Sequence, residues 1–476
     1  MANTLFDKLW DIHTVSMDED GATLLAIDRV MLHERTGGVA LGALAKKSRA
    51  PLSPSRVFAI MDHVVSFREG RGRDESRSPG GEIFITETRS MAKEAGINVI
   101  DTDDARQGIV HVVAPEQGIA YPGVSIICPD SHTCSLGALG ALAIGVGSSE
   151  AEHAMATGVI RTQKPPQLRI WIDSALREGV TAKDLALHII KVYGADGGKR
   201  SAIEFAGPAV DSLSIEERLT LCNLAVEFSA FTAVIAPDRS VAKFVSGRPF
   251  APGKAHWQSA IAAWSVLKTD DGAVFDNEIC VDAGIVGATV SWGTSPEQSI
   301  DIDEEIPSIS SLPDRKQKDA AKAMDYMGVA PGVCPGELEI DGVFIGSCTN
   351  GRLSDLRAAA AVLKGRKIAE GVRAVCVPGS QEIRRRATEE GLDQIFKDAG
   401  FEWGEPGCAM CFYAGGETFP PGARVVSSTN RNFEGRQGPG VRTHLASPAT
   451  AAASAVAGRI VGAHAVAGEN PSSMRG

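Results

Sequence analysis

Residues 342–363 read GVFIGSCTNGRLSDLRAAAAVL and hold the pattern that decides the fold class. The apolar run Gly342–Ile345 predicts a buried strand, and the alanine- and leucine-rich run Leu353–Leu363 predicts a helix. The following stretch repeats this alternation, with a strand predicted over Val372–Val377 and a helix over Ile383–Glu390. Strands that alternate with helices at this spacing indicate an α/β fold with largely parallel sheets.

The same alternation is predicted earlier in the chain. The expected strands are Ile83–Thr88, Gly123–Cys128 and Gln167–Asp173. The expected helices are Ser90–Ala95, Thr181–Tyr193 and one that begins behind a cap at Ser148 or Ser149. A new block begins near Pro165, and the polar stretch Asp301–Asp319 is the best linker candidate.

Length and composition restrict the class of protein. A chain of 476 residues suggests roughly three domains at about 150 residues each. The 48 Lys and Arg against 59 Asp and Glu give a net charge of −11, which argues against a nucleic-acid binder. No segment is typical of a membrane span or a signal peptide, so we expect a cytoplasmic protein whose nine cysteines are reduced thiols or metal ligands.

Three cysteines form the strongest local signal. Cys408 and Cys411 make a CxxC pair, and Cys348 lies between a predicted strand and a predicted helix, where sites of open α/β sheets gather. Three thiolates on a four-iron cluster would leave one iron open as a Lewis acid. A structural zinc site would need a fourth ligand, and two buried thiols with an unrelated third remain the alternative. The other cysteines are expected to be small apolar fillers.

Two aspartate–histidine pairs follow apolar strands and suggest acid–base chemistry. Asp62-His63 follows Val57–Met61, and Asp130-Ser131-His132 follows Ser125–Cys128. An adjacent aspartate can hold an imidazole in one tautomer. His111 is expected within an apolar strand. Glu204, also in an apolar run, is expected to be a buried partner or a site carboxylate with a raised pKa.

The loop from Ser428 to Arg436 reads STNRNFEGR. Its two arginines, Arg431 and Arg436, can bind carboxylates in bidentate fashion. A solvent-exposed turn is the alternative interpretation.

Taken together, four motifs resemble the signature of the aconitase superfamily. They are Asp130-Ser131-His132-Thr133, Gly346-Ser347-Cys348-Thr349-Asn350, Gly407-Cys408-x-x-Cys411 and Asn430-Arg431-Asn432-Phe433-x-Gly435-Arg436. Three further stretches resemble its isopropylmalate dehydratase large-subunit branch: Ile27-Asp28-Arg29, Arg106–His111 and Trp292-Gly293-Thr294-Ser295-Pro296. The resemblance implies three aconitase-like α/β domains (1–165, 166–305 and 306–476) around a central [4Fe-4S] cluster.

The resemblance also implies roles for individual residues. Cys348, Cys408 and Cys411 would bind the cluster, and Asp62-His63 would protonate the leaving hydroxyl. The other implied active-site residues are Asp130 and His132, which would hold the iron-bound water; His111 and Glu204, in supporting positions; Arg431 and Arg436, which would bind carboxylates; and Asn430, Ser131 and His33, which would contact substrate.

The implied reaction is the dehydration and rehydration of a small hydroxy diacid. The first expectation is isomerisation of 2- and 3-isopropylmalate through isopropylmaleate in leucine biosynthesis. A paralogue acting on 2-methylmalate/citraconate or 2,3-dimethylmalate is the alternative, and a cluster-sensing RNA binder is a remote one. The family's swivelling fourth domain, with its catalytic serine and an arginine, is expected on a separate small subunit.

Three departures from the branch pattern bear on the substrate. Leu136 stands where a histidine is usual, the Arg68–Arg77 stretch replaces a short Asn-Val-Pro-Thr-like segment, and Gly198-Lys199-Arg200-Ser201 replaces a Thr-Gly-His-like sequence. They indicate either drift in loops or a different diacid. In the second case Arg71 or Arg73 would contact the substrate or the small subunit.

Overall fold

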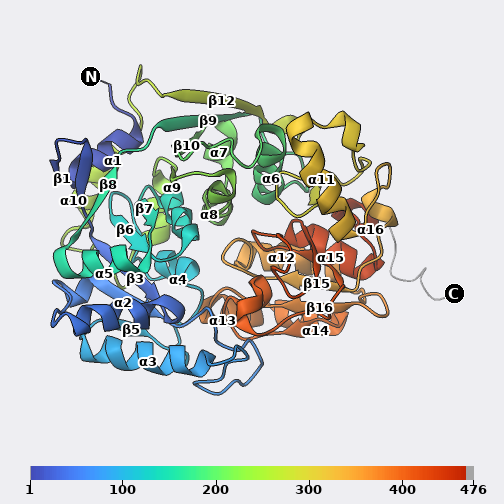
Figure 1. The fold of residues 1–476 in the computed structure, drawn as a ribbon, viewed down its shortest axis with the longest axis horizontal. Helices are drawn as coiled ribbons and strands as arrows, with labels where there is room; N and C mark the ends of the chain where they lie inside the picture. The colour runs from blue at the N-terminus through green and yellow to red at the C-terminus, as the bar shows by residue number, and fades with distance from the viewer. Residues whose placement is uncertain (1, 468–476) are drawn as a thin grey trace. The chain divides into compact units, whose positions relative to one another are not determined.

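A computed structural model describes residues 2–467, and its chain divides into two compact units (Figure 1). The first unit comprises residues 2–65, 80–175 and 198–282. The second comprises residues 66–79, 176–197 and 283–467. Each unit is built around a parallel five-stranded sheet, as the α/β pattern predicts.

The main sheet of the first unit has the order β5-β4-β3-β6-β7, and all its strands run parallel. Its strands are β3 (Arg29–His33), β4 (Val57–Ile60), β5 (Asn98–Ile100), β6 (Ser125–Cys128) and β7 (Leu142–Gly145). β4 and β6 are buried at every position, which explains their continuous apolar sequences.

Two smaller sheets complete the first unit. A parallel sheet has the order β11-β10-β9-β12, with strands Thr232–Val234, Ala202–Ala206, Gln167–Asp173 and Asn277–Asp282. An antiparallel sheet joins β1 (Thr14–Met17), β2 (Ala22–Ala26) and β8 (Val159–Gln163). The helices are α1 (Leu5–His13), α2 (Glu34–Lys46), α3 (Gly81–Glu94), α4 (Val110–Glu116), α5 (Ser148–Thr157), α7 (Pro208–Ser212), α8 (Ile215–Leu224), α9 (Arg239–Val245) and α10 (Trp257–Trp264).

The second unit has a parallel sheet of order β17-β16-β15-β18-β19. Its strands are β15 (Gly342–Ile345), β16 (Arg373–Cys376), β17 (Glu402–Trp403), β18 (Arg424–Ser427) and β19 (Arg442–Leu445), and a hairpin joins β13 (Thr289–Ser291) to β14 (Ser299–Asp301). The helices are α6 (Ala182–Tyr193), α11 (Asp314–Met327), α12 (Leu353–Leu363), α13 (Gln381–Glu389), α14 (Leu392–Ala399), α15 (Pro448–Ala457) and α16 (Ala463–Ala467). The alanine-rich α15 packs against α12 and β15.

Both five-stranded sheets follow the same winding, although the sequence has no evident repeat. In each, the chain adds its second and third strands on one side of the first strand and then crosses to add the fourth and fifth on the other. The order is therefore 3-2-1-4-5 in both. Loops leave the first and fourth strands in opposite directions at such a switch point, which opens a crevice at the carboxyl ends of the strands.

Several predicted elements are confirmed, notably β9, β15, α6 and α12. The strand predicted over Ile83–Thr88 is wrong, because these residues belong to helix α3. Four β-branched residues suggested a strand there, yet the buried Ile85, Thr88 and Ala92 recur at helical spacing. His111 lies in helix α4 rather than in a strand.

Smaller corrections concern helix ends. Gly147, rather than a serine, caps α5, and Glu150 accepts its backbone N–H. The stretch Asp301–Asp319 is only partly a linker, since α11 begins at Asp314.

The division into three domains stays a prediction. Residue 1 of the first predicted domain and residues 468–476 of the third lie outside the described residues. Within residues 2–467, we find no helix with the length and apolar character needed to cross a membrane.

Close backbone packing at Gly137 gives a stability prediction. A Cβ atom there would lie 1.7 Å from the carbonyl oxygen of Ala233 in β11. We expect Gly137→Ala to lower the free energy of unfolding by about 3 kcal/mol through overpacking. Urea unfolding followed by circular dichroism measures this. Gly253→Ala, where a Cβ meets no atom within 4 Å, is the control and should change stability by less than about 0.5 kcal/mol. Equal midpoints for the two variants would contradict the prediction.

Candidate functional site

The switch point of the first unit gathers most of the predicted acid–base residues. β3 ends at His33, β4 is followed by Asp62-His63, and β6 is followed by Asp130. These three strands are neighbours in the sheet and run parallel, so their polar carboxyl-terminal residues meet at one edge.

The carboxylate of Asp130 is the centre of this group. Its Oδ2 lies 3.2 Å from His63 Nε2, and its Oδ1 lies 3.5 Å from His132 Nδ1 and 3.8 Å from His111 Nδ1. The same Oδ1 accepts the backbone N–H of His132 at 2.7 Å, which caps the 3₁₀ helix Ser131–Leu139. One carboxylate therefore orients three imidazoles from three segments of the chain.

His63 lies between two carboxylates and against a second imidazole. Its Nδ1 is 2.6 Å from Asp62 Oδ1, while its Nε2 faces Asp130. The ring of His33 stacks on it with centroids 3.7 Å apart and an interplanar angle of 14°. His33 in turn contacts the carbonyl of Pro129 and the hydroxyl of Thr36 through Nε2. The structure thus brings His33 into the group that includes His63.

Two carboxylates that the sequence did not single out support this group. Glu34 is fully buried and accepts the backbone N–H groups of Asp62 at 2.9 Å and Val64 at 2.5 Å, on either side of His63. Glu227 lies 3.0 Å from His132 Nε2. The placement of Glu34 directly after His33, at a strand-to-helix junction, is the only signal that could have indicated it; Glu227 offers none.

Burial and mutual contact set the charges of these groups. Although burial opposes the charge of Asp130, hydrogen bonds from His132 and His63 hold its pKa well below the usual range. Burial lowers the pKa of His33 and of His111 to about 4, so both imidazoles are neutral at pH 7. Burial, reinforced by the neighbouring Asp62 charge, raises the pKa of Glu34 to about 7.

Glu204 and Ser131 occupy different surroundings. Glu204 lies in β10, where its carboxylate accepts the Thr269 hydroxyl at 2.8 and 2.7 Å and the backbone N–H of Leu5, and burial raises its pKa. These partners lie outside the Asp130 group, so the structure does not join Glu204 to it. Ser131 is exposed at the start of the 3₁₀ helix.

The switch point of the second unit carries the predicted metal ligands. Cys348 follows β15, and Asn430 follows the neighbouring β18. Asn430 Nδ2 donates to Cys348 Sγ at 3.5 Å, and its Oδ1 lies 3.9 Å from Cys411 Sγ. Cys408 and Cys411 are joined by a backbone hydrogen bond of 3.0 Å, and all three cysteines are buried.

The surroundings of the cysteines suit thiolates that ligate an iron–sulfur cluster. The guanidinium of Arg436 donates to Cys411 Sγ at 3.7 Å, and the Ser347 hydroxyl lies 3.4 Å from the same sulfur. Ser347 and Ala409, each next to a cysteine, have φ angles of 82° and 48°, which non-glycine residues rarely adopt. Such backbone strain clusters at functional sites, and hydrogen bonds to sulfur tune cluster properties.

Lys183 is a further site neighbour that the sequence did not indicate. Its fully buried ammonium donates to the carbonyls of Ser428, at 2.9 Å, and Thr429, the first two residues of the Ser428–Arg436 loop. Burial lowers its pKa to about 8, although the nearby carboxylate of Asp355 opposes this shift. Arg431 lies half-buried one residue beyond Asn430.

The six other cysteines and the residues that depart from the branch pattern differ in burial. The filler prediction is confirmed for four cysteines that are buried: Cys128, Cys134, Cys222 and Cys376. It is wrong for Cys280, which is exposed, and for Cys334, which is half-buried. Leu136 is fully buried and contributes to the core of the first unit, whereas Lys199 and Arg200 are exposed.

Comparison with known proteins adds three findings. Residues 7–458 match the family model described as "Aconitase family (aconitate hydratase)". A protein of Bradyrhizobium diazoefficiens named 3-isopropylmalate dehydratase large subunit 1 is 48% identical over 458 residues, which covers 96% of this chain and 95% of that protein. The crystal structure of holo aconitase X from Thermococcus kodakaraensis has a TM-score of 0.45 and 12% identity, covering 89% of this chain and 87% of that one.

The lowered pKa of His111 predicts how stability depends on pH. The folded pKa is about 4 and the ordinary value is 6.5, so between these values the unfolded chain binds a proton that the folded chain lacks. Above about pH 6.5 this histidine therefore leaves the free energy of unfolding unchanged. As the pH falls from 6.5 toward 4, proton uptake by the unfolded chain lowers that free energy. NMR of histidine-labelled protein, with the resonance assigned by its absence in His111→Gln, should show a midpoint near pH 4. A midpoint at the ordinary value would contradict the prediction.

Proposed function

The chain belongs to the aconitase family, and we propose that it is the large subunit of a hydro-lyase that interconverts 2- and 3-isopropylmalate through isopropylmaleate. The observation that carries the proposal is its similarity, along nearly the whole chain, to a relative named as such a large subunit. In support of the proposal, the acid–base candidates His63 and Asp130 and the ligand candidate Cys348 each follow a strand of one of the two parallel sheets.

Loss of hydroxide needs a proton donor, and His63 suits this role. Each of its ring nitrogens faces a carboxylate oxygen, an arrangement in which an imidazolium donates from both nitrogens. Asp62 fixes the orientation of the ring from the Nδ1 side, and Glu34 fixes the backbone on either side of it. A proton on Nε2 can then pass toward the leaving oxygen. Asp130 and His132 would hold the water that the reverse reaction adds.

Cys348, Cys408 and Cys411 would hold a [4Fe-4S] cluster. When bound, the cluster supplies a Lewis acid that stabilises the negative charge on the leaving oxygen. Arg431 and Arg436 would bind the substrate carboxylates, with Asn430, Ser131 and His33 as further polar contacts. Arg436 stays available for this role only in part, because its Nε also donates to the Cys411 carbonyl at 2.8 Å.

A small subunit would complete the enzyme by supplying the swivelling domain with the catalytic serine and an arginine. The polypeptide alone would then hold the cluster but turn over little substrate. A cytoplasmic location, three aconitase-like domains and a supporting role for His111 and Glu204 belong to the same proposal. The paralogous reaction on 2-methylmalate/citraconate or 2,3-dimethylmalate is the second candidate. It is the reaction expected if the substituted Arg68–Arg77 stretch reflects a different diacid.

The test is turnover by the reconstituted pair. The chain is expressed together with a candidate small subunit, and the cluster is assembled anaerobically. We expect kcat/KM for isopropylmalate to exceed that for 2-methylmalate and 2,3-dimethylmalate by about 10-fold or more, since each methylene that an enzyme accommodates in its transition state is worth about 10-fold or more in discrimination. Higher kcat/KM for one of the smaller diacids would make that diacid the substrate instead of isopropylmalate. Robust activity of the single chain would contradict the need for a partner. Salt-dependent RNA retention by the apo chain, without dehydratase activity, would favour the RNA-binding alternative.

Glu227 provides a sharper prediction for the same assay. Glu227→Gln removes the anionic partner of His132 Nε2 while keeping its size, and we expect kcat to fall by about 10- to 100-fold with little change in cluster content. The exposed Glu19→Gln is the control for loss of a negative charge. Parent-like kcat in Glu227→Gln would remove Glu227 from the acid–base group.

A further inference from the structure

The segment Ser66–Pro79, here called the arginine-rich loop, includes the stretch that departs from the branch pattern. It belongs to the second unit, together with the CxxC segment. Its contacts therefore show what the substituted sequence does in this chain.

Arg71 connects the loop to the residues that precede the CxxC pair. Its Nη1 donates to the carbonyl of Ser66 at 2.7 Å and to the carbonyl of Pro406 at 2.8 Å. Pro406 lies two residues before Cys408, and its neighbour Glu405 donates its backbone N–H to the carbonyl of Phe67 at 2.7 Å. The loop thus holds two consecutive residues of the segment that leads into the ligands.

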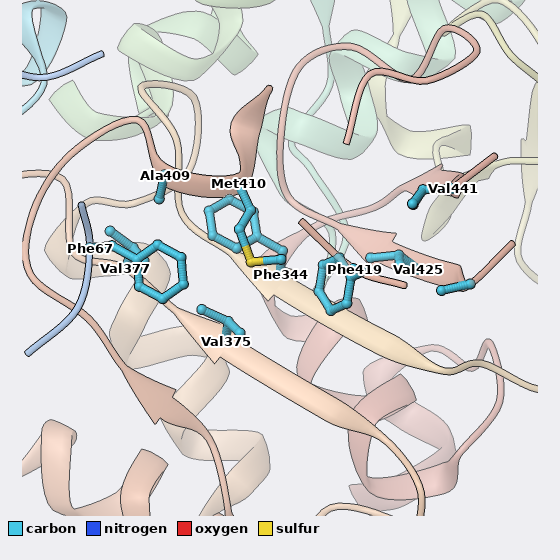
Figure 2. Packing of buried hydrophobic residues seen from close by; sticks show 10 residues of the cluster. Phe67, Phe344, Val375, Val377, Ala409, Met410, Phe419, Val425 and Val441 are labelled. Carbon is cyan, nitrogen blue, oxygen red and sulfur yellow. The ribbon is translucent and has the colours of Figure 1, made fainter. Parts of the chain in front are cut away.

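Phe67 attaches the loop to the core beneath the CxxC turn. Its side chain belongs to the buried cluster that includes Ala409 and Met410, the two residues between the cysteines (Figure 2). A Cβ atom at Gly404 would lie 2.9 Å from the Phe67 ring, so the aromatic ring packs directly on the backbone before the turn.

The far side of the CxxC segment is bound to the same loop. Glu417 accepts the Ser66 hydroxyl at 3.0 Å and the Phe67 N–H at 3.4 Å. A Cβ atom at Gly416 would lie 2.1 Å from the carbonyl carbon of Arg77, which shows how closely the two backbones approach. The loop therefore contacts the chain both before Cys408 and after Cys411.

We propose that the arginine-rich loop is a strap that positions the CxxC ligand turn, with Arg71 as its main positioning residue. That the CxxC turn binds a cluster is taken from the proposed function, and the proposal rests on it. Arg71 contacts main-chain carbonyls at a site internal to the second unit, whereas Arg73 is exposed. In this proposal Arg71 fixes the positions of the cysteine ligands and does not select the substrate.

The first experiment measures thiol reactivity in the apo full-length chain. Iodoacetamide labelling resolved by peptide mapping gives separate rates for Cys408, Cys411 and Cys348. We expect Arg71→Ala to raise the rates at Cys408 and Cys411 by about 10-fold, in the range seen when outer contacts of metal ligands are removed. Cys348 follows β15, and none of the loop contacts described above includes it, so its rate should stay at the parent value.

Two further variants make the test specific. Arg71→Lys keeps the charge but lacks the planar fork, so it should raise the same two rates and serves if Arg71→Ala is not recovered folded. Arg73→Ala, in the same loop, should match the parent. Equal increases at all three cysteines would indicate only global destabilisation and would overturn the proposal, as would unchanged rates in both Arg71 variants or an Arg73→Ala effect as large as that of Arg71→Ala.

The second experiment follows cluster loss after anaerobic reconstitution. Visible absorbance should decay about 10- to 100-fold faster in Arg71→Ala than in the parent during incubation with an iron chelator, while Arg73→Ala decays as the parent does. Parent-like decay in Arg71→Ala would contradict the strap. If the parent itself forms no cluster, the proposed function fails, whereas selective labelling of Cys408 and Cys411 in the apo variants still supports the positioning role.

Discussion

The reversal of winding in a parallel sheet is the constraint on which the candidate residues of each unit depend. Each five-stranded sheet adds strands first on one side and then on the other of its first strand, so the loops after its first and fourth strands diverge. In the first unit His33 ends the first strand and Asp130 follows the fourth, and in the second unit Cys348 and Asn430 follow the corresponding strands. Polar and reactive groups therefore collect where the backbone leaves room for a ligand.

The polar groups at the first switch point are stable there because they satisfy one another. A buried carboxylate is costly unless it is hydrogen-bonded, and Asp130 meets this requirement with the imidazoles of His63 and His132 and a backbone N–H. The buried Glu34 likewise accepts two backbone N–H groups. The same contacts that offset the cost of burial also fix the direction of each ring, so stability and orientation for proton transfer have one origin.

The second switch point is held together differently, mainly by contacts made to the main chain. Strained φ angles at Ser347 and Ala409, a buried lysine on two carbonyls and the loop Ser66–Pro79 all act on the main chain near the cysteines. Thiolates offer few strong hydrogen bonds, so their positions must be set by the backbone that carries them. Close backbone contacts accordingly occur on both sides of the CxxC turn, at Gly404 and at Gly416.

The sequence by itself determined the α/β class, the strand–ligand–helix unit around Cys348 and the identities of most candidate residues, because these depend on local periodicity and short motifs. It misassigned Ile83–Thr88 and His111, where β-branched and apolar residues in buried helices resemble strands. Only the tertiary structure decided that Glu227 rather than Glu204 meets His132, that Glu34 holds the backbone beside His63, and that Arg71 reaches Pro406. These contacts join residues far apart in the chain, and their pairing follows from how strands are ordered in the sheets, which no local pattern encodes.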